Sequence, residues 1–296
     1  VTVIDVNATN ATVVWAPGAA EESWMVEYKK ESDTAWTVAE ASTTEMRHVF
    51  IGLEVNNTYK VRISSLCTTD TMHTVVTFTT ACGKISTFPF EENFDDVAIA
   101  INALPTCWTG YNHSQSVNEG FPKVTNFYFY GNGHNGQSLR LYNYQYSGNA
   151  DSTFSYVTLP EIDVDRRPMS DLRVEFNMLK ADEYYEEFAI IVGVMTDPTD
   201  SATFRPVDTV FISSNYVWQG AEVLFNNYHG NGSHIALMSR PFNGENTNDV
   251  YVDNIKVSLI PNCLRPTDVV ANNVAASTAD IMWTATSASS YIVEYG

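Results

Sequence analysis

The chain has 296 residues and carries 35 acidic but only 16 basic side chains, a formal net charge of −19. This charge argues against a nucleic-acid partner and against binding an anionic membrane surface, because both require clustered Lys and Arg. No apolar run reaches the roughly 18 to 20 residues that span a bilayer, so we expect no direct membrane insertion. A charged fraction of only 17%, with abundant Thr, Val, Asn and Tyr, is typical of a β-rich protein.

The two ends of the chain repeat one another. Residues 1–16 align without a gap with residues 269–284, so that two tryptophans coincide. After one residue of slippage, residues 26–28 fall on residues 293–295. A repeat at this distance predicts two similar modules with a different domain between them, the second module ending after its third strand.

The first module, residues 1–82, predicts seven short strands separated by turn-rich segments. It resembles a fibronectin type III domain in four residues: Trp15, Tyr28 of VEYKK, and Leu53 and Tyr59 of GLEVNNTYKVRIS. The resemblance implies a β-sandwich with Trp15 in the core. It also implies that Tyr59 is the corner tyrosine, whose hydroxyl ties back to nearby backbone. A truncated second fibronectin type III module is expected over residues 263–296.

The four cysteines form no CxxC pair and no zinc-finger spacing, which favours an extracellular disulfide framework. Cys67 and Cys82 would lie roughly 30 Å apart on the two strands of one hairpin, at ~3.3 Å per residue. A disulfide needs Cα atoms within about 7 Å, so this pair is not expected. The repeat favours partners outside the sequence for Cys67 and for Cys263, and a Cys107–Cys263 bond is the alternative.

The central segment, residues 83–262, is too long for a further copy and predicts a larger sandwich of roughly ten to twelve strands. Apolar residues alternate with polar ones in one strand: Leu172, Val174, Phe176 and Met178 against Arg173, Glu175 and Asn177. The run FAIIVGVMT is continuously apolar, as in a strand of a sandwich core. A short segment at residues 180–188 could be a helix or a strand edge. The simplest architecture for this domain is a jelly roll.

The ends of the central segment carry a second resemblance. FPFEENFDD and LPTCWT near its start and DVYVDNIKVS at its end resemble MAM, cleaved-adhesin and choice-of-anchor jelly rolls. In MAM domains a cysteine before the first Phe-acidic strand bonds to a cysteine before a Trp, which implies a Cys82–Cys107 disulfide here. Such domains often accompany fibronectin type III modules in surface proteins of Bacteroidetes-like bacteria. The resemblance therefore implies an extracellular protein, secreted or on the cell surface.

The same end segments suggest a metal site. Because side chains alternate along a strand, Glu92 should share a face with phenylalanines, and Asp253 with Tyr251, Ile255 and Val257. An unpaired buried carboxylate is costly, so each acid should be hydrogen-bonded, neutralised or bound to a metal. If the first and last strands pair, Glu92, Asp95 and Asp253 could hold a structural calcium ion, which the resembling families often contain. The alternative is that each acid accepts backbone hydrogen bonds.

No pattern in the sequence predicts catalysis. The glycine-rich residues 131–136 lack the Lys and Ser/Thr of a phosphate-binding loop, and the six histidines have no metal-site spacing. His229 and His234 are expected to be an exposed loop pair. The acid pair Glu186 and Glu187 stands among 35 acids and carries no weight as a glycosidase signature. We therefore predict that the chain is not an enzyme.

Tyrosines form the one ligand surface that the sequence suggests. The tyrosines and the arginine beside them are Tyr128, Tyr130, Arg140, Tyr142, Tyr144 and Tyr146. Such a row could stack on sugar rings, or bind a protein surface, where tyrosine is enriched. It could equally reflect the preference of β-strands for tyrosine.

These observations predict a non-catalytic extracellular adhesion or binding protein. Its jelly roll would bind a host protein or a glycan, and the fibronectin type III modules would act as spacers. The alternative is an accessory region of a secreted protease or polysaccharide-degrading enzyme, in which the jelly roll assists attachment or stability.

Overall fold

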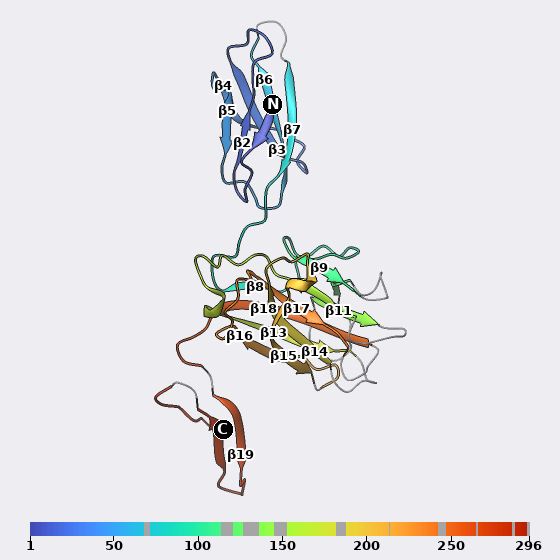
Figure 1. Cartoon of the computed structure of the whole chain (residues 1–296), viewed down its shortest axis with the longest axis vertical. Coiled ribbons are helices and arrows are strands. Elements are labelled where there is room, and N and C mark those ends of the chain that lie inside the picture. The colour runs from blue at the N-terminus through green and yellow to red at the C-terminus, as the bar shows by residue number, and fades with distance from the viewer. Residues whose placement is uncertain are drawn as a thin grey trace.

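The computed structural model describes residues 1–67, 72–113, 121–126, 136–144, 153–181, 188–212, 214–241, 247–264, 266–285 and 288–294. Three groups of strands follow one another along the long axis of the molecule (Figure 1). All strand pairs within the sheets are antiparallel, and the described residues add only two 3-10 turns, η2 (Met169–Asp171) and η3 (Ser201–Thr203). The prediction of an all-β protein is confirmed. No helix in this part of the chain is long and apolar enough to cross a membrane.

The N-terminal group is a sandwich of two sheets. One sheet has the order β1-β2-β5 and the other the order β4-β3-β6-β7. The strands are β1 (Thr2–Ile4), β2 (Ala11–Val14), β3 (Trp24–Lys30), β4 (Thr37–Thr43), β5 (Arg47–Phe50), β6 (Thr58–Ser65) and β7 (His73–Thr79). Alternate side chains of each strand point to the same side, so Val13, Val26 and Val61 are fully buried between the sheets.

The two residues predicted to be structural in this sandwich lie in its core. Trp15 is buried and packs edge-on against Trp24, with ring centroids 6.2 Å apart. Tyr59 is also buried, and its hydroxyl accepts a hydrogen bond from the backbone N–H of Glu54 at 3.0 Å. This bond fastens the loop before β6 to the strand that follows it.

The central group is a larger sandwich. A six-stranded sheet has the order β10-β11-β18-β13-β16, with β8 also pairing to β18, and a five-stranded sheet has the order β15-β14-β17-β12-β9. The strands of the six-stranded sheet are β8 (Phe90–Glu92), β10 (Lys123–Asn126), β11 (Gln137–Tyr144), β13 (Leu172–Lys180), β16 (Gln219–Leu224) and β18 (Thr247–Leu259). Those of the five-stranded sheet are β9 (Thr109–Asn112), β12 (Ser155–Thr158), β14 (Phe188–Met195), β15 (Arg205–Ile212) and β17 (His234–Ser239).

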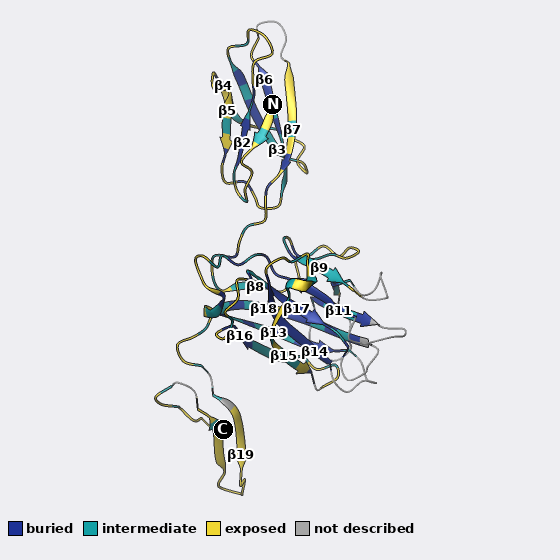
Figure 2. Cartoon of the chain, in the orientation of Figure 1, coloured by how far each residue is buried: buried dark blue, intermediate teal, exposed yellow. Residues whose placement is uncertain are grey.

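The apolar patterns read from the sequence form the core between these two sheets. The strands that carry them are largely coloured as buried in Figure 2. The alternating apolar residues of β13, from Leu172 to Met178, all lie in this core. Strand β14 is buried along its whole length, because Tyr156 and Met238 form a second apolar cluster on its outer side. A strand covered on both sides carries a continuous apolar run. Residues 180 and 188, at the edges of the ambiguous segment, are strand ends.

The first and last strands of the central sandwich lie side by side, as predicted. Strand β8 runs antiparallel to β18, with Glu92 opposite Ile255 and Phe90 opposite Val257. This pairing fastens the beginning of the central group to its end.

The alternation along β18 is interrupted, which the sequence analysis did not foresee. The register against β13 shifts between Glu175 and Asn177, and Asn254 adopts a φ of 52°. This β-bulge inserts one extra residue, so Val252 and Ile255 both face the core. Tyr251 and Asp253 therefore point to the outer side. The prediction that they share a face with Ile255 and Val257 was wrong.

The C-terminal group is one pair of strands, β19 (Thr267–Asn272) and β20 (Asp280–Thr284). The predicted third strand is not formed in the described residues 288–294. In the first copy the corresponding strand, β3, pairs with β4 and β6, which belong to the other sheet. Within the described residues, no strand pairs with residues 288–294.

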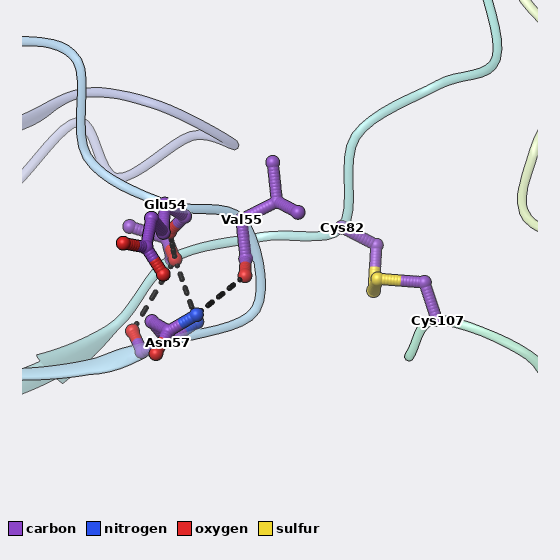
Figure 3. Close-up of a disulfide and its surroundings, with 6 residues drawn as sticks. Glu54, Val55, Asn57, Cys82 and Cys107 are labelled. Carbon is purple, nitrogen blue, oxygen red and sulfur yellow. Dashed lines mark hydrogen bonds between the residues drawn. A yellow bond between two sulfur atoms is a disulfide. The ribbon is translucent and has the colours of Figure 1, made fainter. Parts of the chain in front are cut away.

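One disulfide joins Cys82 to Cys107, with Cα atoms 5.7 Å apart, as the MAM resemblance implies. It lies beside the turn at Glu54 to Asn57 of the N-terminal sandwich (Figure 3). Thr80 fastens the connecting chain to this turn, because its hydroxyl donates to the carbonyl oxygen of Glu54 at 2.6 Å. The bond excludes the Cys107–Cys263 alternative and agrees with the rejection of Cys67–Cys82. Cys67 and Cys263 are exposed free thiols, and their partners outside the sequence stay a prediction.

Candidate functional site

The predicted tyrosine surface is described in part. Tyr128, Tyr130 and Tyr146 lie outside the described residues, and of Tyr144 only the backbone, at the end of β11, is described. Arg140 and Tyr142 are described in full. They point to the outer side of the six-stranded sheet, because Leu139 and Leu141 alternate with them and are buried in the core.

Strand β18 places two further side chains beside Arg140 and Tyr142. Its register sets Tyr251 opposite Arg140 and Asp249 opposite Tyr142. Arg140 binds Asp249 in a two-point contact, with Nε to Oδ1 and Nη2 to Oδ2 both 2.8 Å. The guanidinium carbon lies 4.7 Å from the centre of the Tyr142 ring and 5.9 Å from that of Tyr251. We call these four residues the tyrosine–arginine face.

The charge states of Arg140 and Tyr251 are fixed near neutral pH. Burial lowers the pKa of Arg140, but the hydrogen bond and the charge of Asp249 outweigh it and raise that pKa above its ordinary value. Burial raises the pKa of Tyr251 to about 12, and the charge of Asp249 acts in the same direction. Arg140 therefore stays charged and Tyr251 stays neutral, so the pattern of donors and acceptors does not change with physiological pH.

This arrangement is suited to binding. The two-point contact holds both charged side chains in one geometry, so less conformational entropy is lost when a ligand arrives. Among the described residues, nothing accepts a hydrogen bond from Nη1 of Arg140, which leaves this donor for a ligand. An ion-paired arginine and a neutral tyrosine supply hydrogen bonds and ring surfaces to a ligand.

The sequence analysis missed Asp249 and Tyr251. Both lie more than a hundred residues from Arg140, and only the register of β11 against β18 brings them together. A signal was present in DVYVDN, where Asp249, Tyr251 and Asp253 alternate with two valines. The extra residue at Asn254 concealed it, because the apolar pattern changes side there.

The three candidate calcium ligands each accept a backbone hydrogen bond. Glu92 accepts from the N–H of Phe94 at 2.7 Å, and Asp253 accepts from the N–H of Asn254 at 2.6 Å. Asp95 accepts from the N–H of Gln137 at 3.0 Å. These bonds are of the kind expected under the alternative to calcium.

The geometry does not gather the three acids. Across the described ranges, no group of three or more His, Cys, Asp or Glu could hold a metal ion. The bulge separates the predicted ligands, because Asp253 points to the outer side of the sheet whereas Glu92 stands opposite the inward-facing Ile255. Asp253 is nevertheless buried. A calcium site that includes these acids stays a prediction.

The remaining candidates for chemistry are dispersed. His229 is exposed, whereas His234 is the first residue of β17 and is half-buried. Burial lowers the pKa of His234, so it is neutral at physiological pH. Residues 131–135 of the glycine-rich segment and the pair Glu186 and Glu187 lie outside the described residues.

No protein-family model matches the sequence. No curated protein matches it either. Among solved structures, the K1 cleaved adhesin domain of Lys-gingipain from Porphyromonas gingivalis W83 is 12% identical, with 59% of this chain covering 100% of that domain and a TM-score of 0.41. The CBM22-1–CBM22-2 tandem domain of Paenibacillus barcinonensis Xyn10C is 13% identical, with 87% of this chain and 80% of that chain covered and a TM-score of 0.36. A carbohydrate-binding module of the β-sandwich superfamily is 12% identical, with 85% and 92% covered and a TM-score of 0.36. The chain is thus a distant structural match to these β-sandwich modules, and the likeness carries no conclusion about function.

Proposed function

We propose that this chain is a non-catalytic extracellular binding protein whose central domain binds a glycan. The supporting observation is the tyrosine–arginine face, in which the Arg140–Asp249 pair lies between two tyrosine rings. The central domain would bind a glycan in either setting, as part of an adhesin or as part of the attachment region of a secreted enzyme.

A sugar fits the chemistry of this face. A pyranose ring has flat patches of C–H groups, which pack on tyrosine rings, and adjacent hydroxyls, which both donate and accept hydrogen bonds. Arg140 offers donors and Asp249 offers acceptors in one plane, and their mutual pairing leaves the site without a large net charge. A neutral, polyhydroxylated ligand therefore suits the face better than a strongly charged one.

The surrounding architecture supports a display role. We assign residues 1–82 to a fibronectin type III domain, on the strength of its three- and four-stranded sheets and its Tyr59 hydrogen bond. We assign residues 83–262 to a jelly roll, because its first strand, β8, pairs with its last, β18. Residues 263–296 would begin a second fibronectin type III module. The Cys82–Cys107 disulfide favours an oxidising, extracellular compartment.

A glycan array tests the proposal with two matched variants. Tyr142 lies on the outer side of the six-stranded sheet, and Tyr111 lies in the apolar cluster outside the five-stranded sheet. We expect the wild type to bind a defined set of glycans, Tyr142→Ala to lose them and Tyr111→Ala to keep them. No binding on a broad array, or equal loss in both folded variants, would refute the assignment to this face.

A further inference from the structure

A second surface lies away from the tyrosine–arginine face. It is a groove of about 980 Å³ beside β8 and the adjoining part of β18. Its other wall is formed by residues 96–98 and 104–106, which belong to the loop that the Cys82–Cys107 disulfide closes, and by Trp108, which directly follows that loop. Strand β8 lies at the side of the central sandwich near the chain that leads from the N-terminal sandwich (Figure 1).

Strand β8 lines this groove and has an open edge. It pairs with β18 on one side, and no strand in the described part of the chain pairs with its other side. Phe90, Glu91 and Glu92 form no other backbone hydrogen bond within the described residues. An open strand edge presents N–H and C=O groups at regular spacing, which is a template for an added strand.

The groove is acidic. Glu91, Glu92 and Asp96 line it, and the one basic lining residue, Lys256, already pairs with Glu91 at 2.7 Å. Glu92 and Asp96 therefore contribute negative charge that no lining base neutralises.

The wall that faces β8 carries three apolar side chains in addition to Asp96. Val97, Leu104 and Trp108 all pack against the core of the central sandwich and also line the groove. The disulfide limits the movement of this wall, because it closes the loop between Cys82 and Cys107. A ligand for the groove must therefore combine an extended backbone, a positive charge and an apolar side chain.

We propose that the groove binds an extended basic peptide segment of a partner protein, which adds a strand to the open edge of β8. A Lys or Arg side chain of the segment lies against Glu92 and Asp96, and apolar neighbours lie against Leu104 and Trp108. Main-chain hydrogen bonds supply affinity, and the two walls supply selectivity. This surface is separate from the tyrosine–arginine face, so the chain would bind a glycan and a protein at once.

Fluorescence anisotropy with the whole chain tests this proposal, using labelled peptides in a buffer that contains a chelator. The probes are acetyl-(Val-Lys)₃-Val-amide, the same peptide with Glu in place of Lys, and the Lys peptide with alternate backbone N-methyl groups. We expect the Lys peptide to bind at least about tenfold more tightly than either of the others, because one lacks the charge and the other the hydrogen bonds. Equal binding of the Lys and N-methyl peptides would overturn strand addition. Absence of binding by the Lys peptide would overturn the proposal as a whole.

Protein variants locate the interaction. Glu92→Gln and Asp96→Asn should each weaken binding of the Lys peptide by about three- to tenfold. Asp165→Asn removes the same charge from an exposed position outside the groove and should leave binding unchanged. Arg140→Met should also leave it unchanged, which separates this test from that of glycan binding. Equal weakening by Asp165→Asn would mean a general charge effect and would rule out the groove.

Discussion

Two serines that face each other in the core provide a matched test of the packing between the sheets. Ser155 of β12 and Ser239 of β17 are opposite one another in the five-stranded sheet, and both are fully buried. The Ser239 hydroxyl accepts hydrogen bonds from the Nδ2 atoms of Asn143, at 2.9 Å, and Asn248, at 2.5 Å. Both asparagines belong to the six-stranded sheet. The Ser155 hydroxyl has no hydrogen-bond partner in the described part of the structure.

The structure gives the size of the expected effect. Ser239→Ala removes two buried hydrogen bonds. Asn143 Nδ2 still donates to the backbone carbonyl oxygen of residue 239 at 2.8 Å, and Asn248 Nδ2 still donates to that of Ala189 at 3.3 Å. At about 1 to 1.5 kcal/mol for each bond, the loss of stability should be about 2 to 3 kcal/mol. Ser155→Ala removes a hydroxyl of equal size without a bond, so its effect should be within about 0.5 kcal/mol.

Differential scanning calorimetry of the whole chain measures this difference as a shift of the unfolding transition of the central sandwich. For a domain of this size, Ser239→Ala should lower the transition by roughly 4 to 12 °C and Ser155→Ala by roughly 2 °C or less. Equal shifts in the two variants would refute the reasoning, because the asparagine bonds would then contribute nothing beyond the burial of a hydroxyl.

Three further predictions follow from the cysteines and the acids. Peptide mapping of the unreduced chain should recover Cys82 linked to Cys107. Cys107→Ala should lower the free energy of unfolding by about 3.5 kcal/mol, because it opens a loop of this length. A Cys82 that reacts with thiol reagents in the native chain would contradict both expectations. Calcium should raise the melting temperature of the central sandwich, and Asp253→Ala should abolish this increase. A wild-type melting temperature that changes with neither calcium nor chelator would rule out the calcium site. The folded-state pKa of Glu92 is raised, so its contribution to stability is present at low pH and is lost as pH rises through that pKa. In chelator, Glu92→Gln should therefore gain melting temperature over the wild type as the pH rises above the ordinary pKa of a glutamate, and a constant difference at all pH values would contradict this assignment.

The parts of the fold that local patterns determine could be predicted from the sequence. The alternation in β13 and the continuous run in β14 follow from which sides of each strand are covered, and the residues themselves carry that information. The assignment of Trp15 and Tyr59 to the core came instead from the resemblance to fibronectin type III domains, and both are buried. The Cys82–Cys107 bond came from a family resemblance, because cysteine spacing alone leaves several pairings open.

The parts that depend on register could not be predicted. Alternation placed Arg140 and Tyr142 on one side of β11, but their partners Asp249 and Tyr251 come from a strand far along the chain. The bulge at Asn254 also changed which side of β18 each residue occupies. A one-residue insertion reverses the facing of every residue beyond it.

Glycan binding by the tyrosine–arginine face is the central function proposed for this protein. Isothermal titration calorimetry with a soluble oligosaccharide from the array compares two arginines that are alike in setting. Arg140 and Arg173 both lie on the outer side of the six-stranded sheet, are 26% and 22% exposed, and pair with a carboxylate. We predict that Arg140→Met weakens binding at least about tenfold and that Arg173→Met leaves it unchanged. Saturable binding that Arg140→Met leaves intact would contradict the proposed site.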